Sequence, residues 1–310
     1  MSANGKCGCR GRAENEAFDA KLAYQRLAKK FTELTGVVTT YMSQAGLERD
    51  ARARNAERMA RVLERIVGGT PVEQGDFPEC CVIGQRFSNG TFNWFCTGVL
   101  VHPRVVLTAA HCHSEPQNQI NIVVALNAED IDNLGNAEIV RAKRVRIHPN
   151  FLSTGFNDIG VIILANSAST PPVRIARTSE LAHAQSTRLV GFGNDDIFST
   201  RGFGLKREVE VPITNLRRDD DDDLDDAEGE LGFESDLEFT AGGNGFDSCN
   251  GDSGGPAYIL TGNGRKVAGL TSRPFTTFTN PCGEGGIYTR IDVNMDFVQQ
   301  VASSADIVLP

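Results

Sequence analysis

Five short motifs follow one another along this chain, and few folds can use them in that order. They are Arg65-Ile66-Val67-Gly68-Gly69, Thr108-Ala109-Ala110-His111-Cys112, Asn157-Asp158-Ile159, Asp247-Ser248-Cys249 and Gly251-Asp252-Ser253-Gly254-Gly255-Pro256. A serine, a histidine and a carboxylate are the groups that turn a weak hydroxyl into a nucleophile, and these motifs hold all three. The glycine-rich last motif adds backbone N–H groups that can approach an oxyanion closely. The sequence therefore predicts a hydrolase whose fold brings these motifs together.

The order of the histidine and the serine separates three kinds of hydrolase. The string Gly251-x-Ser253-x-Gly255 also fits the nucleophile elbow of α/β-hydrolases, but that fold needs its histidine after the serine. All of the chain's histidines precede Ser253; they are His102, His111, His113, His148 and His183. A subtilisin-like order needs an acid before the histidine, and the acids there, Asp76 and Glu79, lie in a turn-like stretch without such a motif. The order that remains is histidine, aspartate, serine.

The chain from Ile66 onward has the pattern of an all-β protein. Short runs rich in Val and Ile, such as 99–101, 105–108 and 159–164, are separated by Gly, Pro, Asn and Asp. That pattern predicts a β-barrel or sandwich. Residues 293–302 have helical spacing and predict a terminal helix. Residues 1–65 read as two or three short helices with little core of their own.

Charge is divided unevenly along the 310 residues. The net charge is −9, of which residues 1–65 contribute +5 and the rest −14. A basic head on an acidic body argues against nucleic acid as the main partner, and the two parts could attract each other. Residues 219–238 hold 12 acidic side chains in 20, which is typical of a solvated loop. Calcium could use such carboxylates, but no spaced Asp-x-Asp-x-Asp-Gly loop supports it, and we expect neither metal nor cofactor.

The five motifs in this order resemble the trypsin-like serine endopeptidases, from Ile66 to about Ala302. The resemblance implies the chymotrypsin fold, with two antiparallel six-stranded β-barrels and a C-terminal helix. It divides the chain into a helical basic segment at 1–65 and a protease domain at 66–310, which includes the acidic loop 219–238. It leaves the first 65 residues unexplained.

The resemblance assigns a catalytic role to three side chains and an oxyanion hole to two backbone N–H groups. His111 corresponds to the general base that takes the proton from Ser253. Asp158 corresponds to the buried acid that orients His111 and stabilises its protonated form. The N–H groups of Gly251 and Ser253 correspond to the oxyanion hole.

The resemblance also implies a specificity pocket, with one departure at its rim. Asp247 corresponds to an acid at the base of the primary pocket, which favours Arg or Lys at the cleaved bond. Ser248, Ser272 and Gly286 correspond to other residues of the pocket. The family usually has Ser-Trp-Gly at the substrate-binding edge, where this chain has Ser272-Arg273-Pro274. Because proline has no N–H, the pairing with a substrate backbone should lose a hydrogen bond.

The first motif resembles the activation site of a zymogen. Cleavage after Arg65 would free the amine of Ile66, which in the family pairs with the carboxylate beside the catalytic serine, here Asp252. Cleavage by the enzyme itself and cleavage by another Arg-specific protease are both compatible with the sequence. Residues 1–65 would then be a prosegment that docks on the acidic loop, or a tether to an activating protein.

Cysteine usage and the start of the chain point to different compartments. By resemblance, Cys96 pairs with Cys112 and Cys249 with Cys282, whereas Cys80 and Cys81 have no assigned partner. Paired cysteines favour an oxidising compartment. Residues 1–12 are polar and show no secretory signal, and no run of eighteen uncharged apolar residues predicts a membrane span. The expectation is a cytoplasmic protein, with secretion as the alternative.

Two alternatives to a general peptidase stay open. One is a catalytically silent homologue that serves as a binding module, although the intact triad argues against it. The other is an intracellular regulatory protease with a single partner protein as its substrate. The unusual substrate-binding edge and the lack of a visible signal favour the second.

Overall fold

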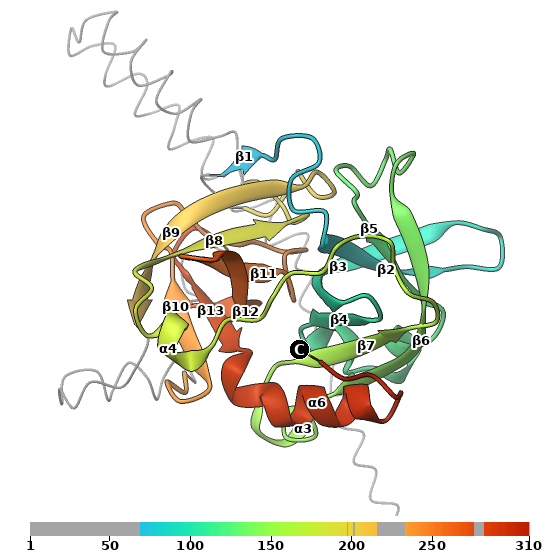
Figure 1. Cartoon of the computed structure of the whole chain (residues 1–310). Helices are drawn as coiled ribbons and strands as arrows, with labels where there is room; N and C mark the ends of the chain where they lie inside the picture. Colours follow the sequence, from blue (N-terminus) through green and yellow to red (C-terminus); the bar gives the residue numbers. More distant parts are fainter. Residues whose placement is uncertain (1–68, 197, 201, 216–232, 276–281, 310) are drawn as a thin grey trace, which may run out of the picture. The chain divides into compact units, whose positions relative to one another are not determined.

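The computed structural model describes residues 69–196, 198–200, 202–215, 233–275 and 282–309. The first half of this part folds into a closed antiparallel barrel with the strand order β2-β3-β4-β7-β6-β5 (Figure 1). Its strands are Cys80–Arg86 (β2), Phe92–His102 (β3), Val105–Thr108 (β4), Ile122–Leu126 (β5), Glu138–Ile147 (β6) and Gly160–Leu164 (β7). Every one of these strands except β2 overlaps one of the predicted Val- and Ile-rich runs, because β-branched side chains pack well on a pleated sheet.

The second half forms another barrel, which closes through the pairing of β8 with β9. Its strands are Ser186–Gly191 (β8), Arg207–Asn215 (β9), Glu238–Ala241 (β10), Pro256–Thr261 (β11), Gly264–Pro274 (β12) and Gly286–Arg290 (β13). The short strand β1, Thr70–Pro71, adds to the outside of β9. Two six-stranded barrels confirm the predicted all-β fold.

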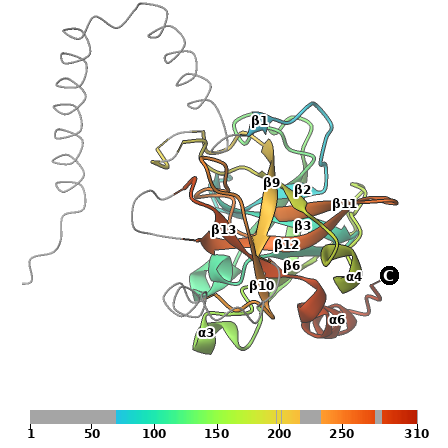
Figure 2. The ribbon, with the colours of Figure 1, turned by 90° about the vertical axis from the view of Figure 1, so that its left-hand side faces the viewer.

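Successive side chains of a strand point to opposite faces of the sheet, so each barrel has apolar side chains in its interior and on its outer face. In β4, Val106 belongs to the core of the first barrel, whereas Val105 and Leu107 belong to a larger core that also holds Val298 and Val301 of the C-terminal helix. This helix, α6, spans Met295–Ser303. The predicted terminal helix is therefore present. It lies at the opposite end of the barrels from β1 in two perpendicular views (Figures 1 and 2).

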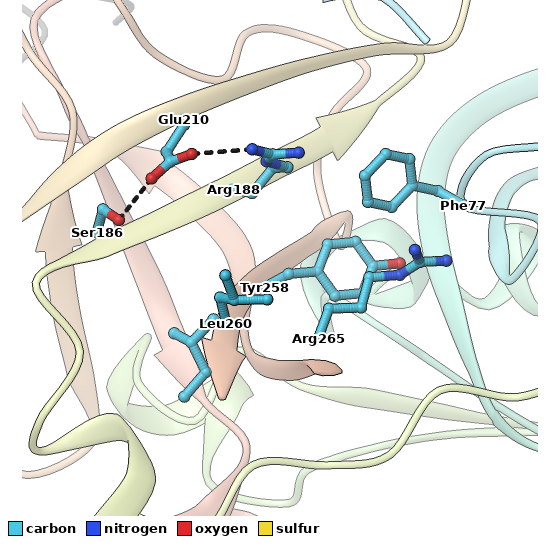
Figure 3. Close-up of a pocket in the computed structure, with 8 residues that line it drawn as sticks. Phe77, Ser186, Arg188, Glu210, Tyr258, Leu260 and Arg265 are labelled. Atoms are coloured by element: carbon cyan, nitrogen blue, oxygen red, sulfur yellow. Dashed lines mark hydrogen bonds and ion pairs between the residues drawn. The ribbon is translucent and has the colours of Figure 1, made fainter. Parts of the chain in front are cut away.

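An aromatic and ionic contact joins the first part of the chain to the second barrel. The ring of Phe77 lies 5.4 Å from that of Tyr258, and the guanidinium of Arg265 lies 4.4 Å above the Phe77 ring. Figure 3 shows these side chains around a cavity on the second barrel. Arg265 also forms two hydrogen bonds, of 3.0 and 3.1 Å, with the buried carboxylate of Glu79. These contacts fix the relation of the two barrels, between which the catalytic motifs meet.

Several expectations fall outside the described residues or need correction. The helices and domain boundary predicted around residues 1–65 lie outside them, as does 219–232 of the acidic loop. The far end of that loop does not fit the prediction, because Glu238 begins strand β10 and is fully buried. An ion pair with Arg273, described below, makes this possible. No helix among the described residues is long and apolar enough to cross a membrane.

Candidate active site

The predicted histidine and aspartate meet at the rim of the first barrel. His111 begins the 3-10 turn His111–His113 that follows β4, and Asp158 lies two residues before β7. His111 Nδ1 is 2.7 Å from Asp158 Oδ2, and the His111 backbone N–H donates to Asp158 Oδ1 at 2.9 Å. Both carboxylate oxygens thus hold one histidine. This arrangement fixes the ring so that Nε2 is left for the serine.

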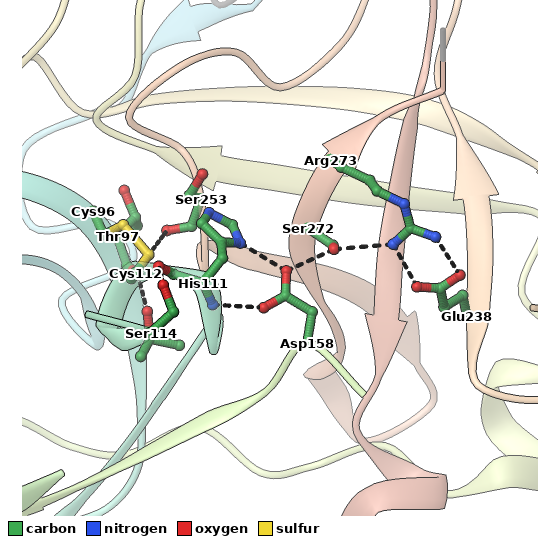
Figure 4. Close-up of polar contacts among 11 residues, drawn as sticks. Cys96, Thr97, His111, Cys112, Ser114, Asp158, Glu238, Ser253, Ser272 and Arg273 are labelled. Carbon is green, nitrogen blue, oxygen red and sulfur yellow. Dashed lines mark hydrogen bonds and ion pairs between the residues drawn. A yellow bond between two sulfur atoms is a disulfide. The ribbon is translucent and has the colours of Figure 1, made fainter. Parts of the chain in front are cut away.

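The second barrel supplies a third hydrogen bond to Asp158. The hydroxyl of Ser272, in strand β12, donates to Asp158 Oδ2 at 2.7 Å (Figure 4). Burial raises the pKa of Asp158, but the hydrogen bonds from His111 and Ser272 outweigh it, so the net pKa lies below the ordinary value. The carboxylate is therefore ionised whenever the enzyme works near neutral pH.

Ser253 is brought beside His111 by hydrogen bonds between the barrels, and Figure 4 shows it next to the imidazole. Its carbonyl accepts the N–H of Thr97 at 2.9 Å, and the Thr97 hydroxyl donates to the carbonyl of Gly251 at 2.8 Å. Both contacts come from strand β3 of the first barrel. The catalytic residues far apart in sequence are thus fixed by contacts across the barrel interface.

The loop before Ser253 has the backbone that an oxyanion site requires. Gly251 has φ +101°, which a residue with a side chain rarely adopts, and a Cβ there would meet the Phe203 ring at 2.7 Å. Among the described residues, neither the N–H of Gly251 nor that of Ser253 has a hydrogen-bond partner. Two adjacent unpaired donors beside a nucleophile can stabilise a developing oxyanion.

Asp252 turns its carboxylate away from the histidine and into the second barrel. Its oxygens accept N–H groups from Gly193 at 2.7 Å and Cys249 at 2.9 Å. The space is so tight that a Cβ on Gly191 would lie 2.0 Å from Asp252 Oδ1. Burial raises the pKa of Asp252 to about 6. No cationic side chain of the described residues forms an ion pair with it, although a buried carboxylate normally has one.

Asp247 is buried beside Gly286 and Tyr288 of strand β13. Its Oδ1 accepts the N–H of Ser248 at 2.7 Å and the hydroxyl of Tyr288 at 3.2 Å. Within the described residues, its Oδ2 is buried without a hydrogen bond of normal geometry. Burial raises the pKa of Asp247 to about 7 against these hydrogen bonds. A Cβ on Gly286 would lie 2.9 Å from Oδ1, which explains the glycine at this position.

The substrate-binding edge contains a contact that sequence reasoning missed. Arg273, in the place of the family's tryptophan, forms two hydrogen bonds with Glu238, of 2.6 and 2.8 Å. The sequence gives no local sign of this pair, because the two residues are 35 positions apart and Glu238 closes an acidic run. Pro274 pairs with Gly286 as the last residue of β12, so its missing N–H falls at the edge expected to meet a substrate.

Both expected disulfides form, at Cys96–Cys112 and Cys249–Cys282. The Cys96–Cys112 bond lies next to His111. The Cys249–Cys282 bond links the loop that contains Asp247 to the segment just before strand β13. Cys80 and Cys81 are free and fully buried in β2. In the part of the chain that the structure describes, the side chains of Cys96, His111 and Cys112 lie close enough together to hold a metal ion. The two sulfurs are bonded to each other and are poor metal ligands.

Comparison with known proteins agrees with this geometry. The protein-family model described as Trypsin matches residues 66–298. The phenoloxidase-activating enzyme 1 of Spodoptera litura is 30% identical over 79% of this chain and 68% of its own length. The trypsin-like protease of Streptomyces glaucescens is 27% identical over 78% of this chain and 82% of its own.

Other relatives are longer than the matched region. The serine protease snk of Drosophila melanogaster is 28% identical over 76% of this chain, which spans 57% of that protein. Among solved structures, the secreted serine protease VesC of Vibrio cholerae superposes with a TM-score of 0.59 at 27% identity. That match covers 76% of this chain and 48% of VesC.

These findings correct the expected location. The cytoplasmic assignment is wrong, because the structure contains two disulfides and a structural relative is a secreted protease. Disulfides persist in oxidising compartments and are rare in the cytosol. The disulfides and the secreted relative indicate a secreted protein.

Proposed function

The chain belongs to the trypsin family of serine endopeptidases, and from that premise we propose that it cleaves proteins after Arg or Lys once it has been cut at Arg65–Ile66. The observation that carries the specificity is the buried, half-partnered carboxylate of Asp247. Residues 65 and 66 lie outside the described residues, so activation rests on the sequence motif and on Asp252. Because several relatives extend beyond the matched region, the substrates and partners of the whole protein are part of the proposal.

The proposed reaction follows from the triad geometry. Nε2 of His111 takes the proton of the Ser253 hydroxyl as its oxygen attacks the scissile carbonyl. Asp158, ionised and hydrogen-bonded to Nδ1, stabilises the imidazolium, which then gives its proton to the leaving amine. The N–H groups of Gly251 and Ser253 receive the negative charge on the tetrahedral oxygen; losing one such donor costs about 10²–10³ in rate. Water and His111 then hydrolyse the acyl-enzyme by the same steps.

The proposed preference for Arg and Lys follows from the state of Asp247. Its unpartnered Oδ2 can accept a charge-assisted hydrogen bond from a guanidinium or ammonium group that enters the pocket. Such a cation also offsets the desolvation that raises the pKa of Asp247 to about 7. Binding of a basic substrate side chain thus gives the buried Asp247 carboxylate a partner, whereas an apolar side chain would leave its Oδ2 unpartnered among the described residues.

The proposed activation follows from the surroundings of Asp252. Its buried carboxylate is held by two N–H groups but lacks a cationic partner among the described residues. The free amine of Ile66 would supply that partner after cleavage, and the pair would stabilise the loop that carries Ser253. A role of residues 1–65 as a prosegment that docks on the acidic loop, or as a tether to an activating protein, stays a prediction.

Two features favour a restricted set of protein substrates over general digestion. Strand β12 ends in Pro274, which has no backbone N–H to donate in a pairing with substrate. Arg273 gives the substrate-binding edge a charged residue instead of an aromatic one. Two relatives are named as phenoloxidase-activating proteins, that is, as activators of another protein. By this analogy, we infer that the protein activates a partner by limited cleavage after a basic residue.

The test compares wild type with Ser253→Ala and Arg65→Gln, each purified as the full chain. Intact mass and N-terminal sequencing follow cleavage, and peptide amides with Arg, Lys, Leu or Phe before the cleaved bond report activity. We expect wild type to yield a chain that begins at Ile66 and to hydrolyse the Arg and Lys peptides. Ser253→Ala should stay silent after added trypsin has cut Arg65 and has then been removed. Lasting silence of the cleaved wild type would instead support the binding-module alternative.

A further inference from the structure

The hydrogen bonds of the triad continue into the second barrel through an ion pair (Figure 4). The carboxylate of Glu238 is fully buried, and the side chain of Arg273 is 28% exposed. Their two short hydrogen bonds place the guanidinium in one fixed plane, the geometry in which arginine binds a carboxylate most strongly. The aromatic ring of Phe156 lies 5.7 Å from the guanidinium carbon. Arg273 is therefore held on more than one side.

The same guanidinium contacts the serine that supports Asp158. Arg273 Nη1 donates to Ser272 Oγ at 3.2 Å, and Ser272 Oγ donates to Asp158 Oδ2 at 2.7 Å. A hydroxyl has one hydrogen and two lone pairs. When Arg273 occupies a lone pair, the hydrogen turns toward Asp158, and the cationic donor makes that hydrogen a better donor. The arrangement also places a positive charge within about 6 Å of the Asp158 carboxylate.

We propose that Arg273, held by Glu238, is a positioning residue for the catalytic triad. It fixes the Ser272 hydroxyl in the orientation that supports Asp158, and it places a positive charge on the hydrogen-bond chain that leads to His111. Its position on the substrate-binding edge makes it part of the surface that meets the substrate as well. The inference rests on the proposed function, because it concerns the same triad, but one of its measurements needs no turnover.

Arg273 and Glu238 carry opposite charges, so replacing one or the other should have opposite effects on the imidazolium form of His111, and these effects can be measured. A positive charge near His111 disfavours the imidazolium, whereas a negative charge favours it. Arg273 is nearer to the triad than Glu238 along the hydrogen-bond chain, so the two residues act in opposite directions with unequal strength. The acidic limb of kcat/KM against pH reports the balance between imidazole and imidazolium in the free enzyme.

Other titratable groups around His111 do not supply the same signal. His113 follows His111 in its turn, but burial lowers its pKa and its Nδ1 is bonded to the carbonyl of Asn118 at 2.6 Å. From the second barrel, Asp252 faces Gly193 instead of the imidazole. Arg273 and Glu238 are the charged side chains that connect to the triad through Ser272.

The experiment measures the acidic limb of kcat/KM for Arg273→Met, Glu238→Gln and the double variant, after activation and active-site titration. Removing the cation should move the limb to higher pH by about 0.3–1 unit, and removing the anion should move it to lower pH by a similar or smaller amount. The double variant should lie between them. Arg273→Lys, which keeps the charge but not the two-point contact, should restore the limb while kcat stays below wild type.

A control and a second readout separate this proposal from simple damage to the fold. Arg188→Met makes the same charge change at an exposed ion pair on β8 and should not move the limb. In the Ser253→Ala background, the NMR resonance of the proton between His111 and Asp158 should titrate with the same opposite shifts. Shifts of equal sign in both single variants, or none, would overturn the proposal. An inactive wild type would defeat the proposed function, but the NMR titration would still decide this point.

A second inference concerns the hairpin between β2 and β3, far from the triad in sequence. Asn89-Gly90-Thr91 is the one Asn-x-Ser/Thr sequence in the 310 residues, and the residue between is not proline. Asn89 is exposed at the tip of the turn. Its Oδ1 accepts both the hydroxyl of Thr91 at 2.7 Å and the N–H of Thr91 at 3.0 Å. The amide nitrogen is left without a hydrogen-bond partner among the described residues.

We infer that Asn89 is a site of N-linked glycosylation when the protein passes through a eukaryotic secretory pathway, in keeping with its corrected location. The amide nitrogen would attack the anomeric carbon of a lipid-diphosphate oligosaccharide. The nitrogen–carbon bond forms as the carbon–oxygen bond breaks, the electron pair leaves with the lipid diphosphate, and the amide loses one proton to a base. A glycan there would project into solvent from the hairpin without displacing core side chains.

The test is secretion from insect cells, followed by a glycoamidase that hydrolyses the bond between the glycan and the asparagine side-chain nitrogen. We expect a loss of mass on treatment and conversion of Asn89 to Asp in the released peptide. Asn89→Gln and Thr91→Ala should abolish both, whereas Thr91→Ser should keep them, because serine retains the required hydroxyl. An unmodified Asn89 in secreted wild-type protein would refute the inference.

Discussion

Replacing Asp247 by Asn should weaken the activity of the protein and strengthen its fold, and the two effects share one cause. The carboxylate is buried with one oxygen unpartnered, which suits it to receive a cationic substrate and makes it costly when the pocket is empty. Asparagine keeps the shape and can still accept hydrogen bonds from Ser248 and Tyr288. It removes the charge and replaces the second oxygen by an NH2 group of similar size, which makes the substitution a direct test of the charge at this position.

The magnitude follows from the pKa. A carboxyl whose pKa rises from 3.8 to about 7 on folding binds its proton more tightly in the folded state. The cost to stability is absent below pH 3.8, grows as the pH rises, and is complete above pH 7, where it amounts to about 4 kcal/mol at most. Asp247→Asn should recover most of this at pH 8 and none at pH 3.8 or below. The loss of the charged contact should lower kcat/KM for an Arg peptide by about 10²–10⁴-fold.

The assay is urea unfolding of both proteins at pH 8 and pH 3.5 in the Ser253→Ala background, which prevents self-digestion. Peptide hydrolysis is measured in the parent background. Equal stabilisation at both pH values would show that the effect does not come from ionisation, and no stabilisation at pH 8 would refute the account of Asp247. Unchanged hydrolysis of Arg peptides would remove it from the specificity pocket.

Three further substitutions test other parts of the site. Asp158→Asn should lower kcat by about 10⁴-fold, the loss that this change causes in the family's template enzyme, and rates in active-site-titrated enzyme check it. Gly251→Ala should lower kcat more than it raises KM, because a Cβ would meet Phe203 and strain a backbone at φ +101°; an equal effect on both constants would contradict this. Replacing Cys249 and Cys282 together by Ala opens a link across 33 positions and should cost about 3–4 kcal/mol in urea unfolding, with unchanged stability as the contrary result.

The fold class and the triad could be predicted from the sequence because their signals are local. Alternating and β-branched runs report strands wherever one face of a sheet is buried. The triad was recognisable from chain order, since every histidine precedes Ser253, which removes the α/β-hydrolase arrangement without any knowledge of the structure. In the structure, hydrogen bonds of 2.7 Å link Asp158 to both His111 and Ser272, whereas the catalytic roles of these residues stay predictions.

The errors arose where a local signal was overridden by a contact from elsewhere. Glu238 closes a run of acidic residues, and its composition alone indicates solvent, yet it begins a buried strand. The cytoplasmic assignment rested on the first residues of the chain, whereas the disulfides depend on cysteines that only the folded barrels bring together.

By itself, the sequence determined which groups are available and in what order the chain presents them, and for a triad built from rare residue types that was enough. The tertiary structure decided the surroundings on which their chemistry depends. Within the part of the chain that the structure describes, Asp247 has an unpartnered oxygen, Asp252 is buried without a cationic partner, and Arg273 of β12 is joined to Glu238 of β10. The reason is that a pKa or a buried ion pair depends on distance and desolvation in space, and these are properties of the packed barrels that no local pattern of residues encodes.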